Sequence, residues 1–252
     1  MATVAIDRSD RYNFYQTVGG EPLIRRKPNV ATSSDWIIWQ LADSAFPSGG
    51  FAHSGGIEVA LRWGELRRAD DLDEYLKTNL TQIAHSGVPF VLAANQDPQQ
   101  FEELDQLCNA FLSNHVANRA SRAQGQAFLI AAEAAFQRDS CKKLRTLLNE
   151  GHLIGHLPAV FGFVTAELDI DSESAARLFL YIGLRGLVSS AVRLNLIGPL
   201  KGQAIQSTLG PFADQLCDQC ICRRVDEVAQ TAPIIDILQQ TQDRLYSRLF
   251  QS

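Results

Sequence analysis

The segment DSESAARLFLYIGLRGLVSSAVRLNLI, from Asp171 to Ile197, says most about how this chain folds. Asp171 is a residue type that caps helix N-termini. The run that follows is apolar on nearly every side, which predicts a helix buried in a protein core. Arg185 and Arg193 interrupt it. Because a buried charge needs a partner, we expect each arginine to meet a carboxylate or a helix C-terminus, in this chain or in another.

Helical periodicity continues outward from this stretch. Apolar residues spaced three and four apart, separated by breaks at Gly and Pro, predict helices along most of the chain. The expected ranges are 36–43, 54–64, a helix from Asp70, 88–95, a helix from Pro98, 117–137, 157–168, 171–197, 203–228 and 233–250. No alternating run bounded by hairpin turns predicts a strand. The predicted fold class is therefore all-α, a single-domain helical bundle of roughly ten helices over residues 35–252, preceded by a flexible N-terminal arm over residues 1–34.

Composition narrows the function. The chain has 252 residues, of which 46% are apolar and 20% are charged, and this excludes a wholly disordered protein. A net charge of −5 argues against nucleic-acid binding, which needs a basic surface. Five unevenly spaced cysteines favour a reducing compartment, most simply the cytoplasm. We expect no signal peptide, and no membrane span either, because the uncharged stretch 151–166 is shorter than the roughly 20 residues needed.

A glycine-rich segment, Pro47 to Gly56, is the first candidate for chemistry. It does not fit a phosphate-binding loop, because Ile57 and Glu58 stand where that loop needs a Lys and a hydroxyl residue. Ser48 and Ser54 lie near His53, but the chain has no Gly-x-Ser-x-Gly nucleophile motif. The sequence therefore predicts no nucleotide site and no hydrolytic site.

Two further groups of residues could in principle bind a metal ion. Cys217, Cys220 and Cys222 contain a CxxC spacing, and His152 and His156 are four residues apart. Neither group has the second ligand pair that a metal site requires. Buried structural side chains are the favoured interpretation, and direct metal binding is kept as the alternative.

The C-terminal segment is predicted to form an amphipathic helix over residues 233–250, opened by Pro233. Its apolar residues include Ile234, Leu238, Leu245 and Leu249. Such a helix can cover the core of its own chain, or it can lie in the groove of a partner. The residues alone leave these two interpretations even.

Several blocks in a fixed order resemble the UreF family of urease accessory proteins. The matching blocks are Trp39–Glu58, Gly125-Gln126, Gly155–Gly162, Leu187–Leu194 and Ala232–Asp236 continuing to Arg248–Ser252. Together they extend over residues 36–252. The turn Gly198–Gln203, the clustered cysteines and the N-terminal arm depart from the pattern.

This resemblance implies an all-α homodimer that is not an enzyme and carries no cofactor and no metal of its own. UreF-like proteins bridge UreD (also called UreH) and the GTPase UreG, whose GTP hydrolysis they have been viewed as regulating, and the assembly delivers nickel to apo-urease. By position, the residues expected to face UreG are Pro47, Gly49, Gly50, His53, Gly56, Glu58 and Arg193. Those expected to face UreD are Ile234, Leu238, Leu245, Arg248, Leu249 and Phe250. A metallochaperone that binds nickel itself and an enzyme of the helical class are the competing hypotheses.

Overall fold

The computed structural model describes residues 33–67 and 69–252, and within these residues the chain forms ten α-helices and no strand. The all-α prediction is confirmed. The predicted N-terminal arm lies outside the described residues, apart from its last two positions. The α-helices are α1 (Ser33–Ala42), α2 (Ile57–Trp63), α3 (Ala69–Gln96), α4 (Phe101–Phe111), α5 (His115–Phe136), α6 (Asp139–Asn149), α7 (Leu157–Glu167), α8 (Ser172–Arg193), α9 (Pro199–Cys220) and α10 (Pro233–Gln240). Short 3₁₀ helices are η1 (Gly50–Ala52), η2 (Pro98–Gln100), η3 (Val225–Glu227) and η4 (Thr241–Arg244).

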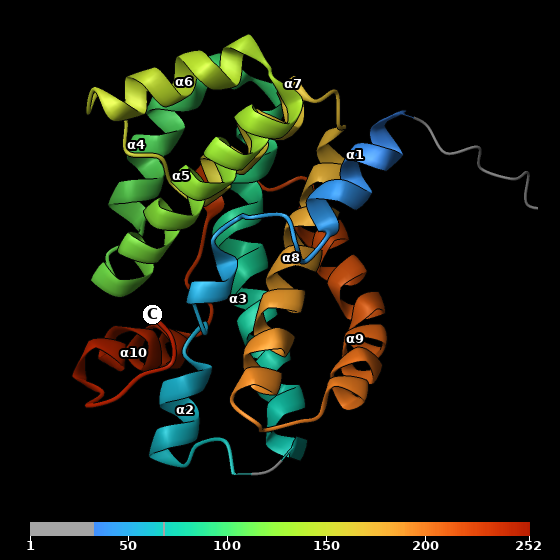
Figure 1. Ribbon diagram of the computed structural model, residues 1–252, viewed down its shortest axis with the longest axis vertical. Helices are drawn as coiled ribbons and strands as arrows, with labels where there is room; N and C mark the ends of the chain where they lie inside the picture. The colour runs from blue at the N-terminus through green and yellow to red at the C-terminus, as the bar shows by residue number, and fades with distance from the viewer. Residues whose placement is uncertain (1–32, 68) are drawn as a thin grey trace, which may run out of the picture. The chain divides into compact units, whose positions relative to one another are not determined.

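Helix α8 is the apolar helix that the sequence predicts to be buried. It packs between α3 and α9 (Figure 1), and its N-cap Asp171 accepts a hydrogen bond of 2.9 Å from the Ser174 amide. Arg185 donates to the carbonyl of Ala42, the last residue of α1, so this arginine meets a helix C-terminus as expected. Among the described helices α8 alone is long and apolar enough to cross a membrane, but 56% of that stretch is buried within the protein, as in a core helix.

Helix α3 runs unbroken through the point where the sequence predicts a break between two helices. Pro89 lies inside it, and a proline there leaves the carbonyl of residue 85 without its helical donor. The amide of Ala229 donates to that His85 carbonyl at 3.2 Å. The prediction of a separate helix over 88–95 is therefore wrong, because a residue distant in sequence replaces the lost hydrogen bond.

Helices α5 and α7 approach the neighbouring backbone closely at glycine positions. A Cβ atom on Gly125 would lie 2.1 Å from the carbonyl oxygen of Gly155, and one on Gly162 would lie 2.3 Å from that of Val91. No side chain fits at either distance, so these contacts between α5 and the segment before α7, and between α7 and α3, require glycine.

A buried carboxylate fixes the segment that leads into α7. Asp105 of α4 is 1% exposed and accepts hydrogen bonds from the amides of Ile154, Gly155 and His156 at 2.7, 2.9 and 2.8 Å. These bonds supply partners for backbone donors just before the first turn of α7, where no helical acceptor exists.

Other helix boundaries differ from the sequence predictions. The expected helix over 203–228 begins earlier, at Pro199, and ends at Cys220. Helix α6 was not predicted, because its charged sequence buries only Cys141 and Leu144. The expected C-terminal helix over 233–250 is also too long: α10 ends at Gln240, η4 follows, and residues 245–252 are not helical.

Candidate functional site

The C-terminal residues fold back onto the glycine-rich segment, so the two segments singled out in the sequence meet. The amide of Gln251 donates to the carbonyl of Ala52 at 2.8 Å, and the amide of Ser54 donates to a backbone oxygen of Ser252. We call the contact between residues 47–58 and residues 241–252 the loop–tail junction.

Glycines shape the loop side of this junction. Gly49 has a φ of 74° and Gly56, which precedes the first residue of α2, has a φ of 86°, a left-handed conformation that other residues rarely adopt. The carbonyl of Gly55 accepts hydrogen bonds from Tyr75 Oη at 2.9 Å and from Asn79 Nδ2 at 3.1 Å. The loop is therefore held on α3 in one conformation, with Pro47 and Gly49 exposed and Gly50 half-buried.

Glu58 is the central acceptor of the junction. Its carboxylate accepts from the amides of Leu249 and Phe250 at 2.7 and 3.1 Å and from Gln242 Nε2 at 2.8 Å. Arg62 lies 4.0 Å away and supplies a positive charge. Glu58 is fully buried and holds the tail of its own chain. That it helps to shape a partner-facing surface stays a prediction.

His53 is half-buried beside Ser252. Its Nδ1 is hydrogen-bonded to Ser252 Oγ, and its carbonyl accepts from Ser190 Oγ at 3.3 Å. Burial, together with the positive charge of Arg119, lowers the pKa of His53 to about 4. The ring is therefore neutral at pH 7 and acts at this contact as an uncharged hydrogen-bonding group.

Arg193 connects α8 to both sides of the junction. Its guanidinium donates to the carbonyl of Phe51 and lies 4.3 Å from the centre of the Phe250 ring and 5.3 Å from that of Phe51. Cation–π contacts at these distances are attractive. The sequence left Arg193 open between an interface charge and a buried ion pair; the structure gives a half-buried arginine that packs against two rings.

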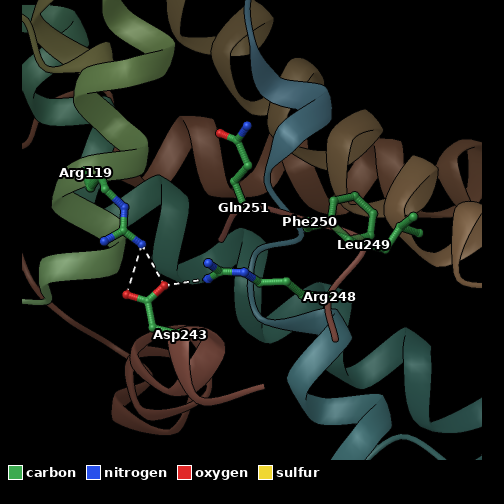
Figure 2. A pocket seen from close by; sticks show the side chains of 6 residues that line it. All are labelled: Arg119, Asp243, Arg248, Leu249, Phe250 and Gln251. Carbon is green, nitrogen blue, oxygen red and sulfur yellow. Dashed lines mark hydrogen bonds and ion pairs between the residues drawn. The ribbon is translucent and has the colours of Figure 1, made fainter. Parts of the chain in front are cut away.

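The outer face of the tail carries a small ion-pair cluster, shown in Figure 2. Asp243 accepts from Arg119 of α5 at 2.9 Å and from Arg248 at 2.7 Å. Burial acts against ionisation of Asp243, but hydrogen bonds from Arg248 and Arg119 outweigh it and lower the pKa of this carboxyl. The cluster joins the tail to α5, and no local pattern in the sequence predicts a pairing between residues this far apart in the chain.

The predicted C-terminal residues divide between two environments. Leu238 and Phe250 are each 2% exposed, and Leu245 is half-buried against the core. In contrast, Ile234 and Leu249 are each 53% exposed, and Arg248 is exposed as well. Sequence reasoning did not single out Ile237 and Tyr246, which are also exposed. The segment thus covers its own core on one side and presents apolar side chains on the other.

The candidate metal ligands do not come together. His156 is buried and its ring nitrogens contact Ser121 Oγ at 3.2 Å and Asn109 Oδ1 at 3.1 Å, whereas His152 is exposed beside Glu150. Cys217 and Cys220 are buried and Cys222 is exposed. Burial raises the pKa of Cys217 to about 11, which disfavours the thiolate that binds metals. Among the described residues no group of three or more His, Cys, Asp or Glu could hold a metal ion.

Comparison with known proteins identifies relatives along most of the chain. The profile of the UreF family matches residues 66–210. Urease accessory protein F of Arabidopsis thaliana is 35% identical over 227 residues, covering 88% of this chain and 95% of the plant protein. The protein of the same name from Oryza sativa subsp. indica is 34% identical over 235 residues, covering 90% of each chain. Urease accessory protein UreF of Trichodesmium erythraeum is 26% identical over 230 residues, covering 88% and 98%.

Proposed function

Since the chain belongs to the UreF family of urease accessory proteins, we propose that it acts in urease maturation as a non-catalytic scaffold. In this proposal it bridges UreD (UreH) and the GTPase UreG and modulates GTP hydrolysis, while nickel passes to apo-urease as cargo. The active form is a homodimer, and the work takes place in the cytoplasm. The relatives are named accessory proteins, which supports a role without chemistry of its own.

The observation that carries this proposal is the two-sided character of the segment from 233 to 252. Its inner side is anchored by Leu238 and Phe250, and its outer side exposes Ile234, Leu249 and Tyr246. Exposed apolar side chains grouped with an arginine are typical of protein-binding surfaces. Because the inner contacts hold the segment in place, the outer side chains are positioned before any partner arrives, which reduces the entropy lost on binding.

The loop side of the junction offers a second surface to a partner. Phe51 is 58% exposed, and Pro47 and Gly49 are exposed beside it. The loop is rigid because of its hydrogen bonds to Tyr75 and Asn79. We assign the tail side to UreD and the loop side to UreG, and the shared junction places the two partners next to each other.

Surface substitutions test this assignment better than deletion of residues 233–252, because deletion would remove buried core residues such as Ile235 and leave Glu58 without its donors. We expect Leu249→Glu to weaken capture of UreD and Phe51→Glu to weaken capture of UreG in a pull-down with all three accessory proteins and apo-urease. Each variant should bind its partner at least tenfold more weakly, because the new charge lies in an apolar contact at the centre of the interface.

Leu200→Glu is the matched control, because Leu200 is 88% exposed at the start of α9 and lies outside the junction. It should retain both partners. If the Leu249→Glu protein keeps its helical content and still captures UreD, the assignment of the tail side to UreD is wrong. Turnover of a substrate by the purified chain alone would contradict the scaffold proposal itself.

A further inference from the structure

The helical bundle contains a cavity of about 250 Å³ that the scaffold role does not use. Its walls come from α3, α5, α7 and α8, and residues of the loop–tail junction complete it. Figure 1 shows α3 and α8 running beside each other at the centre of the described bundle. A cavity of 150 Å³ is large enough for benzene, so this one has room for a molecule of roughly ten non-hydrogen atoms.

Small residues create this space. Gly183 and Gly186 of α8 and Ala120 of α5 face it, and a Cβ atom added to Gly186 would meet no other atom within 4 Å. Most of the larger side chains in the wall are apolar, among them Ile83, Phe128 and Leu187. A protein interior usually closes such space by packing, whereas glycine and alanine here keep the walls apart.

The wall carries no charged side chain at neutral pH. None of the described residues that line the cavity is an Asp, Glu, Lys or Arg. His53 is neutral because burial and Arg119 lower its pKa to about 4, and burial raises the pKa of the Cys108 thiol. A charged ligand would therefore lose its hydration without gaining an ion pair, which excludes it.

Most of the polar side chains in the wall are already hydrogen-bonded within the protein. Asn79 donates to the Gly55 carbonyl at 3.1 Å, Ser86 donates to the Gln82 carbonyl at 2.7 Å, and Ser121 accepts from the Leu157 amide at 3.2 Å. Water in a cavity needs two to four polar partners per molecule. Because these groups are engaged elsewhere, the lining suits an apolar molecule better than a cluster of waters.

We propose that this cavity is a binding site for a small, uncharged, mainly apolar molecule, with Gln124 and His53 as the polar groups that can orient it. Ser252 of the tail also lines the cavity. A bound molecule of this class therefore stabilises the bundle and the closed loop–tail junction together. The site adjoins the partner surfaces assigned above, because residues of the loop and the tail complete its wall.

Indole is a suitable probe, because it is neutral, flat and within the size limit. We expect saturating indole to raise the thermal midpoint of the full chain by about 2–4 °C and to shift the methyl NMR signals of Ile83, Ile182 and Leu187. Benzoate, which is of similar size but carries a charge, should do neither.

Gly186→Leu fills the cavity and should abolish the effect of indole. Gly210→Leu is the matched control, because Gly210 also lies inside a helix with no atom within 4 Å of an added Cβ but lies outside the cavity wall. It should keep the full indole response. Methyl shifts located elsewhere, an equal midpoint rise in both variants, or no rise in the wild-type chain would each overturn the proposal. The methyl shifts of the wild-type chain decide the question even if Gly186→Leu does not fold.

Discussion

Two buried carboxylates hold chain segments by the same chemistry in two regions of the molecule. Asp105 accepts three backbone amides from the segment that enters α7, and Glu58 accepts two backbone amides from the tail, together with the amide side chain of Gln242. The segment held by Asp105 continues directly into a helix with seven buried residues of eleven and no exposed one. The segment held by Glu58 has Phe250 as its buried anchor and is otherwise largely exposed.

This difference separates a structural contact from one that can open. Releasing the Asp105 segment also disturbs α7, which packs against α3 and α5, so its opening requires much of the bundle to unfold. Releasing the tail exposes one large aromatic side chain and breaks the hydrogen bonds of the junction, but it leaves the contacts between the long helices in place. The tail can therefore open locally while the bundle stays folded. The candidate partner surface lies in the region that opens locally.

The largest effect is expected from Asp105→Asn. An asparagine offers one acceptor oxygen to three buried amides, and unsatisfied buried donors are costly, so the free energy of unfolding should fall by about 3 kcal/mol. Urea unfolding followed by circular dichroism measures this loss. Glu103→Gln on the exposed side of the same helix is the control and should change the free energy by less than about 0.5 kcal/mol. Equal losses in the two variants would contradict a structural role for Asp105.

Glu58→Gln should weaken the junction more than the bundle. The side chain keeps one acceptor oxygen but loses its charge, so we expect about 1–2 kcal/mol of lost stability, concentrated in the tail. Hydrogen exchange should become about tenfold faster or more at the amides of Leu249 and Phe250. If hydrogen exchange at the amides of α7 becomes faster to the same extent, the tail does not open independently of the bundle. The two carboxylates would then not differ in the way described above.

Acid should also weaken the junction. The pKa of His53 is lowered to about 4 from an ordinary value of 6.5, so the unfolded chain takes up a proton at this site before the folded chain does. Its contribution to stability is therefore complete above about pH 6.5, declines as the pH falls towards 4, and is then lost. A pKa shift of this size corresponds to about 3 kcal/mol at most, and solvent screening at this half-buried ring reduces the expected decline to about 1–2 kcal/mol.

Urea unfolding of wild-type and His53→Gln proteins between pH 4 and 7 isolates this contribution, because other titrating groups affect both proteins alike. The variant should show the shallower decline. His152→Gln, at an exposed site, should follow the wild-type profile. A decline in His53→Gln as steep as in the wild type would show that protonation of His53 does not control the junction.

The smallest effect is expected from Arg193→Lys. The lysine keeps the charge but loses the planar group that packs against Phe250 and Phe51, at a cost of about 0.5–1 kcal/mol. Exchange of the Phe250 amide reports this cost. Arg177→Lys, at an exposed ion-pair network on the same helix, should leave that amide unchanged. If the Phe250 amide of Arg193→Lys exchanges at the wild-type rate, the cation–π contact does not stabilise the junction.

The sequence predicted some elements closely and others poorly, and the difference follows the range of the interactions. The helices expected at 117–137, 157–168 and 171–197 correspond to α5, α7 and α8, because apolar periodicity and capping are local properties. The break expected before Pro89 was wrong, since the Ala229 amide that satisfies His85 is distant in the chain. The C-terminal helix predicted over 233–250 was too long for a similar reason, because contacts with Glu58 hold residues 249 and 250 in a non-helical conformation.

The all-α class, the buried character of α8 with its Asp171 cap, and the membership of the UreF family could all be predicted from the amino-acid sequence. These properties depend on the order of residues that are neighbours in the chain. The burial of Glu58, the packing of Arg193 on Phe250, and the closure of the tail over the glycine-rich loop became visible only in the folded chain. Such pairings join residues far apart in the chain, and a carboxylate becomes a buried acceptor only when folding brings amide donors to it and removes water.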